Sequence, residues 1–214
     1  PELATLVDSP PSGDDWLHEI KFDGYRLISV LDGGKVRILT RNGKDWTTRF
    51  GAIAGALETL PVKNAVFDGE AVVLNKDGIS DFQALQNALK ESRKAALHYF
   101  IFDLLYCGGF DLTLASLIER KTLLKKILGG SGKSGVLRYS DHIAGNGGAV
   151  LDNACSMSLE GIVSKRASAP YVQRRTRDWL KVKCHKRQEF VIGGYKLSTK
   201  ASRAGFGSLL LGYY

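Results

Sequence analysis

The sequence has few cysteines and no long apolar run. Cys107, Cys155 and Cys184 are the three cysteines among 214 residues, and none forms a C-x-x-C pair. This spacing supports neither a disulfide framework nor a zinc site, so three reduced thiols are expected. No apolar stretch approaches the roughly 20 residues that span a bilayer, and the first fifteen residues lack the basic and apolar regions of a secretion signal. These absences predict a cytoplasmic protein with no membrane partner.

Composition is that of an ordinary globular protein. A hydrophobic content of 44% over 214 residues is enough for one well-buried core, with room for a second small module. The sequence begins at Pro1 and not at Met. We therefore expect a segment of a longer protein.

Positive charge is concentrated toward the C-terminal end. The chain carries a net charge of +8, and residues 160–203 contain twelve Lys or Arg against three acidic residues. Such a block is often a solvated surface. A one-sided cluster that contains the run RRTR at 174–177 is also typical of a polyanion-binding face, and the motifs inside the block favour nucleic acid.

The apolar periodicity predicts an α+β fold with mainly antiparallel sheets. Alternating residues and tight turns indicate strands, while spacing of three to four residues indicates helices. The run GGSGKSG at 129–135 lacks P-loop spacing and follows a helix, so it is predicted to be a linker. Strands are predicted at 16–22, 25–31, 35–40, 64–75, 97–106, 135–140, 160–166, 178–184, 189–197 and 205–214. Helices are predicted at 47–60, 82–90, 112–128 and 147–158.

The segment EIKFDGYR places Lys21 between two carboxylates, Glu19 and Asp23, followed by Gly24 and Arg26. Taken alone, Asp-Gly between apolar runs predicts a β-hairpin, with Lys21 an ordinary solvated residue. Five further charged or aromatic segments follow in the sequence, and each has an equally plain structural interpretation. These segments are RNG (41–43), DGE (68–70), FIFD (100–103), EGIVSK (160–165) and WLKVK (179–183).

The six segments in this order resemble the motif set of the covalent nucleotidyltransferases, which include ATP-dependent DNA ligases, RNA ligases and mRNA-capping enzymes. The resemblance spans residues 19–183 and is closest to the ligase module of bacterial DNA ligase D, an end-joining repair enzyme. It implies the DNA ligase adenylation fold over residues 1–186. Residues 187–214 resemble the first strands of an oligonucleotide-binding (OB) fold β-barrel, which the chain does not complete.

The resemblance implies that Lys21 attacks the α-phosphate of ATP and carries AMP, which then passes to a DNA 5′-phosphate. A lysine at its ordinary pKa of about 10.4 is almost wholly protonated, so desolvation or neighbouring cations must favour the amine. Lys181 and Lys183 share one face of a predicted strand and suit both this task and transition-state charge. Mg²⁺ or Mn²⁺ is the implied metal.

The remaining motif residues are assigned by the same resemblance. Glu160 and Glu70 are the expected metal ligands, and Glu70 is also the expected ribose contact. Phe102 is expected to stack on adenine. Glu19, with its neighbour Ile20, is expected to distinguish adenine from guanine, because a carboxylate accepts from the 6-amino group. The other three assignments are Arg26 and Arg41 to phosphate or ribose, and Asp23 to orienting Lys21 or holding a metal.

The implied partners are nicked or broken double-stranded DNA in a bacterial nucleoid and other repair domains fused to this one. Two alternatives remain open from the sequence. One is an RNA ligase or a GTP-using capping enzyme, and the other is a catalytically idle nucleic-acid-binding module. Competition between ATP and GTP for Lys21 separates the enzymes.

Overall fold

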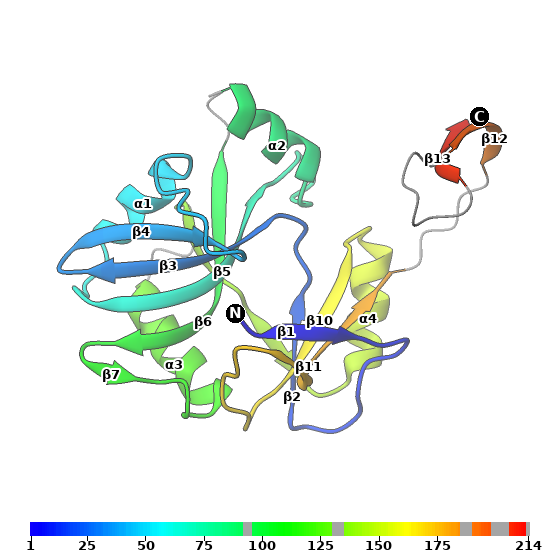
Figure 1. The fold of residues 1–214 in the computed structure, drawn as a ribbon. Helices are drawn as coiled ribbons and strands as arrows, with labels where there is room; N and C mark the ends of the chain where they lie inside the picture. Colours follow the sequence, from blue (N-terminus) through cyan, green and yellow to red (C-terminus); the bar gives the residue numbers. More distant parts are fainter. Residues whose placement is uncertain (92–95, 130–134, 185–189, 198–205, 213–214) are drawn as a thin grey trace. The chain divides into compact units, whose positions relative to one another are not determined.

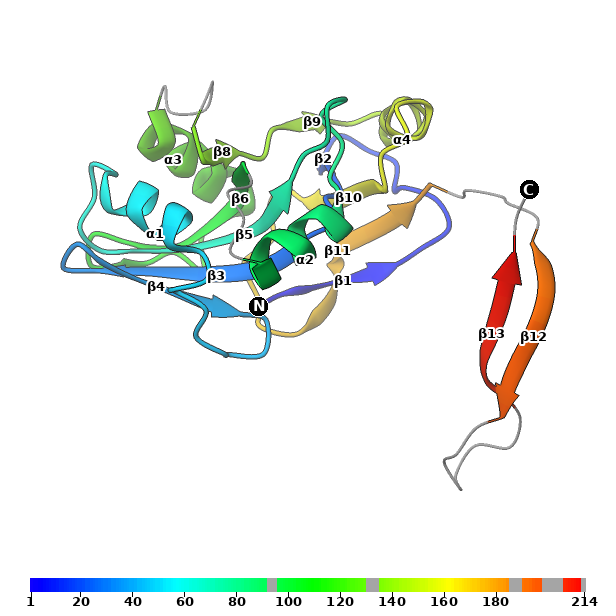
Figure 2. The ribbon, with the colours of Figure 1, turned by 90° about the horizontal axis from the view of Figure 1, so that it is seen from above.

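The computed structural model describes residues 1–91, 96–129, 135–184, 190–197 and 206–212. The chain divides into two compact units, Pro1–Cys184 and His185–Tyr214. Two β-sheets and four helices make up the described part of the larger unit, as Figures 1 and 2 show. Among the described helices, none is long and apolar enough to cross a bilayer.

A five-stranded sheet joins segments from both ends of the larger unit. Its strand order is β1-β11-β10-β2-β9. The pair β1–β11 is parallel, and the other pairs are antiparallel. The strands are β1 (Leu3–Leu6), β2 (Trp16–Ile20), β9 (His142–Ala144), β10 (Gly161–Arg166) and β11 (Arg175–Lys183).

A six-stranded sheet has the order β4-β3-β5-β6-β7, with β8 paired to β6 in parallel. The predicted tight turn at 32–34 joins β3 to β4 as a hairpin. The prevalence of antiparallel pairs confirms the predicted α+β class. The strands are β3 (Tyr25–Asp32), β4 (Lys35–Thr40), β5 (Ala65–Val73), β6 (Leu97–Cys107), β7 (Phe110–Asp111) and β8 (Leu137–Tyr139).

The Asp23–Gly24 turn does not close a hairpin, because β2 and β3 belong to different sheets. The chain instead crosses here from the five-stranded to the six-stranded sheet. A Cβ atom on Gly24 would lie 2.1 Å from the carbonyl oxygen of Ala71 on β5, so the crossing requires glycine. The hairpin interpretation of this turn is therefore wrong.

Each helix matches one of the four predicted segments. All lie within the predicted ranges, except that the helix predicted at 82–90 ends one residue later. Asp81 Oδ1 accepts from the amide of Ala84 and caps α2, as expected. Ser116 and Glu119 form a capping box, and α3 begins at Leu117, five residues after the predicted start. The helices are α1 (Gly51–Glu58), α2 (Phe82–Glu91), α3 (Leu117–Leu128) and α4 (Gly147–Ser156).

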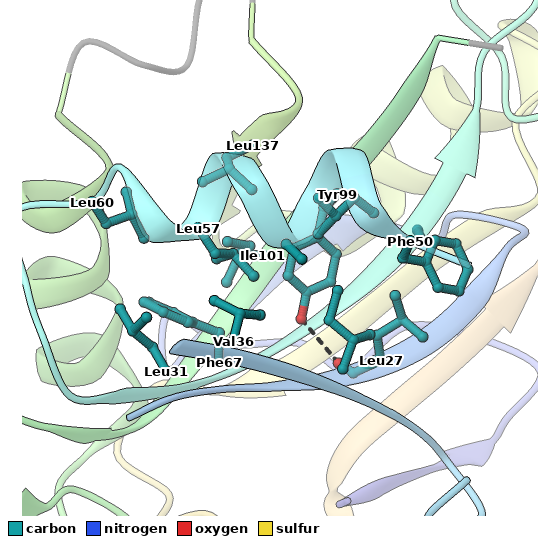
Figure 3. Packing of buried hydrophobic residues seen from close by; sticks show 14 of the residues in the cluster. Leu27, Leu31, Val36, Phe50, Leu57, Leu60, Phe67, Tyr99, Ile101 and Leu137 are labelled. Carbon is teal, nitrogen blue, oxygen red and sulfur yellow. Dashed lines mark hydrogen bonds between the residues drawn. The ribbon is translucent and has the colours of Figure 1, made fainter. Parts of the chain in front are cut away.

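The main apolar core lies on one face of the six-stranded sheet, against α1 and α3. Figure 3 shows α1 lying across this face. Tyr99 is fully buried there, and its hydroxyl donates to the carbonyl of Leu27 at 3.0 Å. Because side chains alternate along a strand, the opposite face of β3, β5 and β6 is free for polar residues.

The expectation of three reduced thiols is wrong for two of them. Cys155 in the last turn of α4 and Cys184, just after β11, form a disulfide with Cα atoms 5.3 Å apart. Helix α4 packs on β10, the strand beside β11, and this brings together residues separated by 29 positions. Local C-x-x-C spacing carries no information about such a pair. Cys107 remains a free thiol.

The smaller unit contains an antiparallel pair, β12 (Val191–Leu197) and β13 (Phe206–Gly212), where two strands were predicted. The basic connection between them lies outside the described residues. Residues 130–134 of the predicted GGSGKSG linker also lie outside the described part of the chain.

Candidate active site

A pocket of about 180 Å³ in the larger unit receives side chains from both sheets. Eight of the predicted site residues line it: Glu19, Ile20, Lys21, Arg26, Arg41, Glu70, Phe102 and Lys181. Leu3 and Ala4 of β1, together with Phe22, Val163, Lys165, Arg175 and Trp179, complete the lining. The six separated motifs therefore meet in one place.

Strand register explains how the five-stranded sheet presents its side chains. Val163 on the central strand β10 lies opposite Glu19 on β2 and opposite Lys181 on β11. These three residues consequently form one row across the sheet. Lys165 lies opposite Trp179 in the next row toward the interior, two residues along β10. The two rows thus bring Glu19, Lys165, Trp179 and Lys181 to the same face of the sheet, where all four line the pocket.

Lys21 lies just beyond the end of β2, beside the carboxylate of Glu160. The Lys21 Nζ is 2.5 Å from one Glu160 oxygen, and the Lys183 Nζ is 3.3 Å from the other. The backbone amide of Lys21 donates to the carbonyl of Gly161. Gly161 has φ +145°, and a Cβ there would lie 2.0 Å from the Val182 carbonyl, so only glycine allows this close approach.

The charged groups around Lys21 shift the pKa values of Lys181 and Asp23. Burial lowers the pKa of Lys181, and the nearby cations Lys21, Arg175 and Lys183 lower it further. The pKa of Asp23 is raised by partial loss of solvent first and by the charge of Glu160 second, while Lys21 opposes the shift. The lysine pair predicted from the sequence therefore does lie around Lys21.

Glu19 lies at the buried end of the pocket and is 2% exposed. Its Oε1 accepts from Lys121 Nζ at 2.8 Å, and its Oε2 accepts from Lys165 Nζ at 2.9 Å and Ser140 Oγ at 3.0 Å. Burial alone would raise the pKa of Glu19, but the two lysines outweigh it and hold that pKa below its ordinary value. The carboxylate is therefore ionised.

Arg26 forms a bidentate pair with buried Asp68 on β5, with both N···O distances at 2.6 Å. Its Nη2 also donates to the carbonyl of Glu2, and Tyr171 donates its hydroxyl to Asp68 at 2.6 Å. Arg26, which was predicted to contact phosphate or ribose, is thus already strongly paired with Asp68. Its Nη1 group, for which no bond is formed among the described residues, is the part that can meet a ligand.

Glu70 and Arg41 line the pocket from the six-stranded sheet and the turn after it. Burial raises the pKa of Glu70 to about 7, against the opposing charges of Arg26 and Lys21. Glu70 therefore changes charge near neutral pH. Arg41 is exposed at the end of β4, and its guanidinium forms no ion pair within the described residues.

Phe102 projects from β6 into a group of aromatic and cationic side chains. It is 8% exposed and meets Trp179 edge-on, with ring centroids 5.9 Å apart. Lys165 Nζ lies 4.1 Å from the Phe102 centroid, and the Arg26 guanidinium lies 4.7 Å from it. Burial lowers the pKa of Lys165 to about 8, although Glu19 opposes this.

Glu160 is the carboxylate beside Lys21 that could hold a divalent cation. It is 24% exposed and near Asp23, and the described residues contain no group of three or more metal-ligating side chains. Mg²⁺ in nucleotide sites typically uses one or two carboxylates, phosphate oxygens and waters. One partly exposed carboxylate beside a pocket lined by cationic side chains fits that pattern.

Several lining residues were missed by the sequence analysis. Lys165 and Trp179 fall within two of the quoted motifs, so their segments were identified without their roles. Leu3 and Ala4 gave no signal, because the short strand β1 has no periodic pattern. Lys121, which pairs with Glu19 but does not line the pocket, lies in the helix predicted at 112–128 and gave no separate signal.

The chain matches a family model described as an ATP dependent DNA ligase domain over residues 1–183. It is 47% identical over 214 residues to the multifunctional non-homologous end joining protein LigD of Pseudomonas aeruginosa, covering 100% of this chain and 25% of that protein. The corresponding LigD of Mycobacterium tuberculosis is 33% identical over 198 residues, covering 92% of this chain and 25% of its own length. The chain therefore spans about a quarter of these relatives.

Solved structures give the same picture. A mycobacterial DNA ligase D complexed with ATP and MES matches with a TM-score of 0.76 at 33% identity, covering 99% of this chain and 67% of that one. The Chlorella virus DNA ligase-adenylate matches with a TM-score of 0.65 at 20% identity, over 100% of this chain and 80% of that one, which is a likeness of fold.

Proposed function

Because the chain belongs to the family of ATP-dependent DNA ligase domains, we propose that it forms a covalent AMP adduct on Lys21 and passes the AMP to a DNA 5′-phosphate for strand joining. One observation carries this proposal: the Lys21 Nζ lies at a pocket, within reach of Glu160 and beside Lys181 and Lys183. A nucleophile with two further cations around it suits attack on a phosphate ester.

The chemical step exchanges one bond at phosphorus for another. The Lys21 amine attacks the α-phosphorus of ATP, an N–P bond forms, the P–O bond to pyrophosphate breaks, and a proton leaves the nitrogen. Lys21 must first leave Glu160, with which it forms an ion pair. Lys181 and Lys183 then balance the negative charge on the phosphoryl oxygens. A divalent ion at Glu160, with Glu70 the other candidate ligand, would supply charge neutralisation for the phosphates.

Recognition of the nucleotide falls to the more buried residues. We assign purine contact to Glu19, Ile20 and Phe102, and ribose contact to Glu70. Arg26 Nη1 and Arg41 are donors for phosphate or ribose oxygens. For Asp23, at the crossing between the sheets, we propose the role of orienting Lys21 or of sharing a metal with Glu160.

DNA strands and fused repair domains are the proposed partners. The cationic segment around β11 suits a DNA backbone. The β12–β13 unit is proposed as the start of an OB-fold domain. End joining is proposed from the names of the relatives, of which this chain spans about a quarter.

Intact mass spectrometry tests the function directly. After incubation with ATP and Mg²⁺, the chain should gain the mass of one AMP, and the adduct should be acid-labile, as a phosphoramide is. Lys21→Ala should carry none, whereas Lys35→Ala, an exposed lysine of β4, should be labelled normally. An AMP adduct that persists in Lys21→Ala would refute the assignment. Preference for GTP over ATP would identify a capping-type enzyme.

A further inference from the structure

Helix α3 buries two consecutive cations, Arg120 and Lys121, which are 1% and 0% exposed. Buried charges are costly unless each is paired. Arg120 forms a bidentate pair with Asp103 of β6, which anchors the helix to the six-stranded sheet. Arg120 therefore explains how α3 is anchored to the sheet, and the burial of Lys121 needs another explanation.

Lys121 extends across the gap between the two sheets to Glu19 on β2. Its Nζ lies 2.8 Å from Glu19 Oε1 and 2.9 Å from the backbone carbonyl of Ser140, and it is 4.7 Å from the centre of the Tyr139 ring. Ser140 follows β8 of one sheet and precedes β9 of the other. Lys121 binds Glu19 Oε1, whereas Ser140 Oγ and the pocket-lining Lys165 share Glu19 Oε2.

The three donors leave little freedom to the Glu19 carboxylate. A carboxylate can accept about four hydrogen bonds. Lys121, Lys165 and Ser140 provide three of them, so roughly one acceptor position remains. Because Glu19 lines the pocket, that position is available to a ligand, and the two lysines keep the group ionised and acceptor-only.

We propose that Lys121 is a positioning residue for purine recognition, which, assisted by Ser140, holds Glu19 so that its remaining lone pair meets the 6-amino group of the nucleotide. This inference rests on the proposed function. Lys121 itself does not line the pocket. Its effect on purine choice passes entirely through the orientation of Glu19.

Charge balance makes Lys121 a practical residue to replace. Lys121→Met keeps most of the side-chain volume and leaves Glu19 paired with Lys165, so no buried charge loses its last partner. Lys125→Met is the matched control, because Lys125 lies one turn later on α3, is 67% exposed and pairs with Asp141 at the surface. Ser140→Ala is a second, milder variant, since it removes a single hydroxyl from Glu19.

The experiment compares ATP with purine riboside 5′-triphosphate, which lacks the 6-amino group. Formation of the covalent lysyl-nucleotide is followed by intact mass, and the ratio of kcat/KM for the two nucleotides is measured in each full-length variant. A hydrogen bond to a charged group corresponds to a preference of about 10- to 100-fold for ATP in the wild type. Lys121→Met should reduce it to within about threefold, Ser140→Ala should give an intermediate ratio, and Lys125→Met should leave it unchanged.

A purely structural role would lower stability or overall rate and leave this ratio unchanged. Wild-type selectivity in Lys121→Met would therefore overturn the inference. If Lys121→Met does not fold, wild-type selectivity in Ser140→Ala would overturn it in the same way. A wild type without any preference would overturn it too. Absence of any covalent adduct in the wild type would instead refute the proposed function.

Discussion

Two carboxylates of the candidate site, Glu19 in the pocket lining and Glu160 beside Lys21, are held in contrasting ways. Glu19 is 2% exposed and accepts hydrogen bonds from three buried groups on α3, β10 and the β8–β9 connection. Glu160 is 24% exposed and contacts the ammonium groups of Lys21 and Lys183. One carboxylate is fixed by the fold, and the other is held by partners that the proposed chemistry must separate.

Because they are held differently, Glu19 and Glu160 suit different tasks. Preorganised groups in a buried site cost no reorganisation when a ligand binds, which suits recognition of a base. The Lys21–Glu160 pair is only partly buried, with side chains 18% and 24% exposed, so separating it costs less than separating a fully buried pair. The contrast leads to four predictions, in order of decreasing expected effect.

Glu19→Gln should destabilise the fold by about 3–5 kcal/mol, because it leaves the buried ammonium groups of Lys121 and Lys165 without a charged partner. Urea denaturation measured by circular dichroism gives the free energy of unfolding. Glu58→Gln, at an exposed position of α1, is the control and should change it by less than about 0.5 kcal/mol. If Glu19→Gln lowered the free energy of unfolding by less than about 1 kcal/mol, this would contradict the conclusion that the fold holds Glu19 in a fixed position.

Lys181→Met and Lys183→Met should each slow adenylation by about 10²-fold or more, since both remove charge from the transition state. Single-turnover transfer of label from α-labelled ATP measures this rate. Arg177→Met, an exposed cation of the same strand that does not line the pocket, should retain the normal rate. Near-normal adenylation with both lysines replaced would return them to the role of surface charges.

Glu70 should make stability pH-dependent between about pH 4.5 and 7. Its pKa is raised to about 7 in the folded chain, from an ordinary value of 4.5, so the folded state binds the proton more tightly in this interval. The free energy of unfolding should therefore fall as pH rises, by at most about 3 kcal/mol. Glu70→Gln should flatten this part of the stability profile, measured by urea denaturation at several pH values. A profile parallel to the wild type would show that Glu70 titrates normally.

Glu160→Gln should be the smallest change in stability, within about 1 kcal/mol, because its ion pairs are partly exposed. Thermal unfolding beside Glu19→Gln makes the comparison direct. Equal destabilisation by the two variants would remove the distinction between the fixed and the exchangeable carboxylate.

The motif residues could be identified because the six segments, in this order, resemble the motif set of a known family, whereas each segment taken alone has a plain structural interpretation. Strand and helix positions followed from periodicity. The sheet change at Gly24 could not, because Asp-Gly turns look alike whether they close a hairpin or join two sheets. Lys121 was missed because a lysine on an amphipathic helix is usually solvated, and its burial depends on Glu19, 102 residues earlier.

The disulfide and the strand β1 illustrate the same limit. Both depend on contacts between distant segments, 155 with 184 and 3–6 with 175–181, which no local spacing indicates. The roles of individual pocket residues remain predictions, although the structure brings those residues together.

The edge strand β1 has a consequence for where this domain can be cut. Glu2 is fully buried, and its carboxylate accepts from Val172 and Thr176 while its amide donates to Tyr171. A recombinant version without the first six residues would lose these hydrogen bonds of Glu2. It would also lose Leu3 and Ala4, which line the pocket. It would also leave the backbone of β11 unpaired along one side, and an open sheet edge is a template for aggregation. Solubility of the trimmed protein is thus tied to the same few residues that enclose the nucleotide pocket.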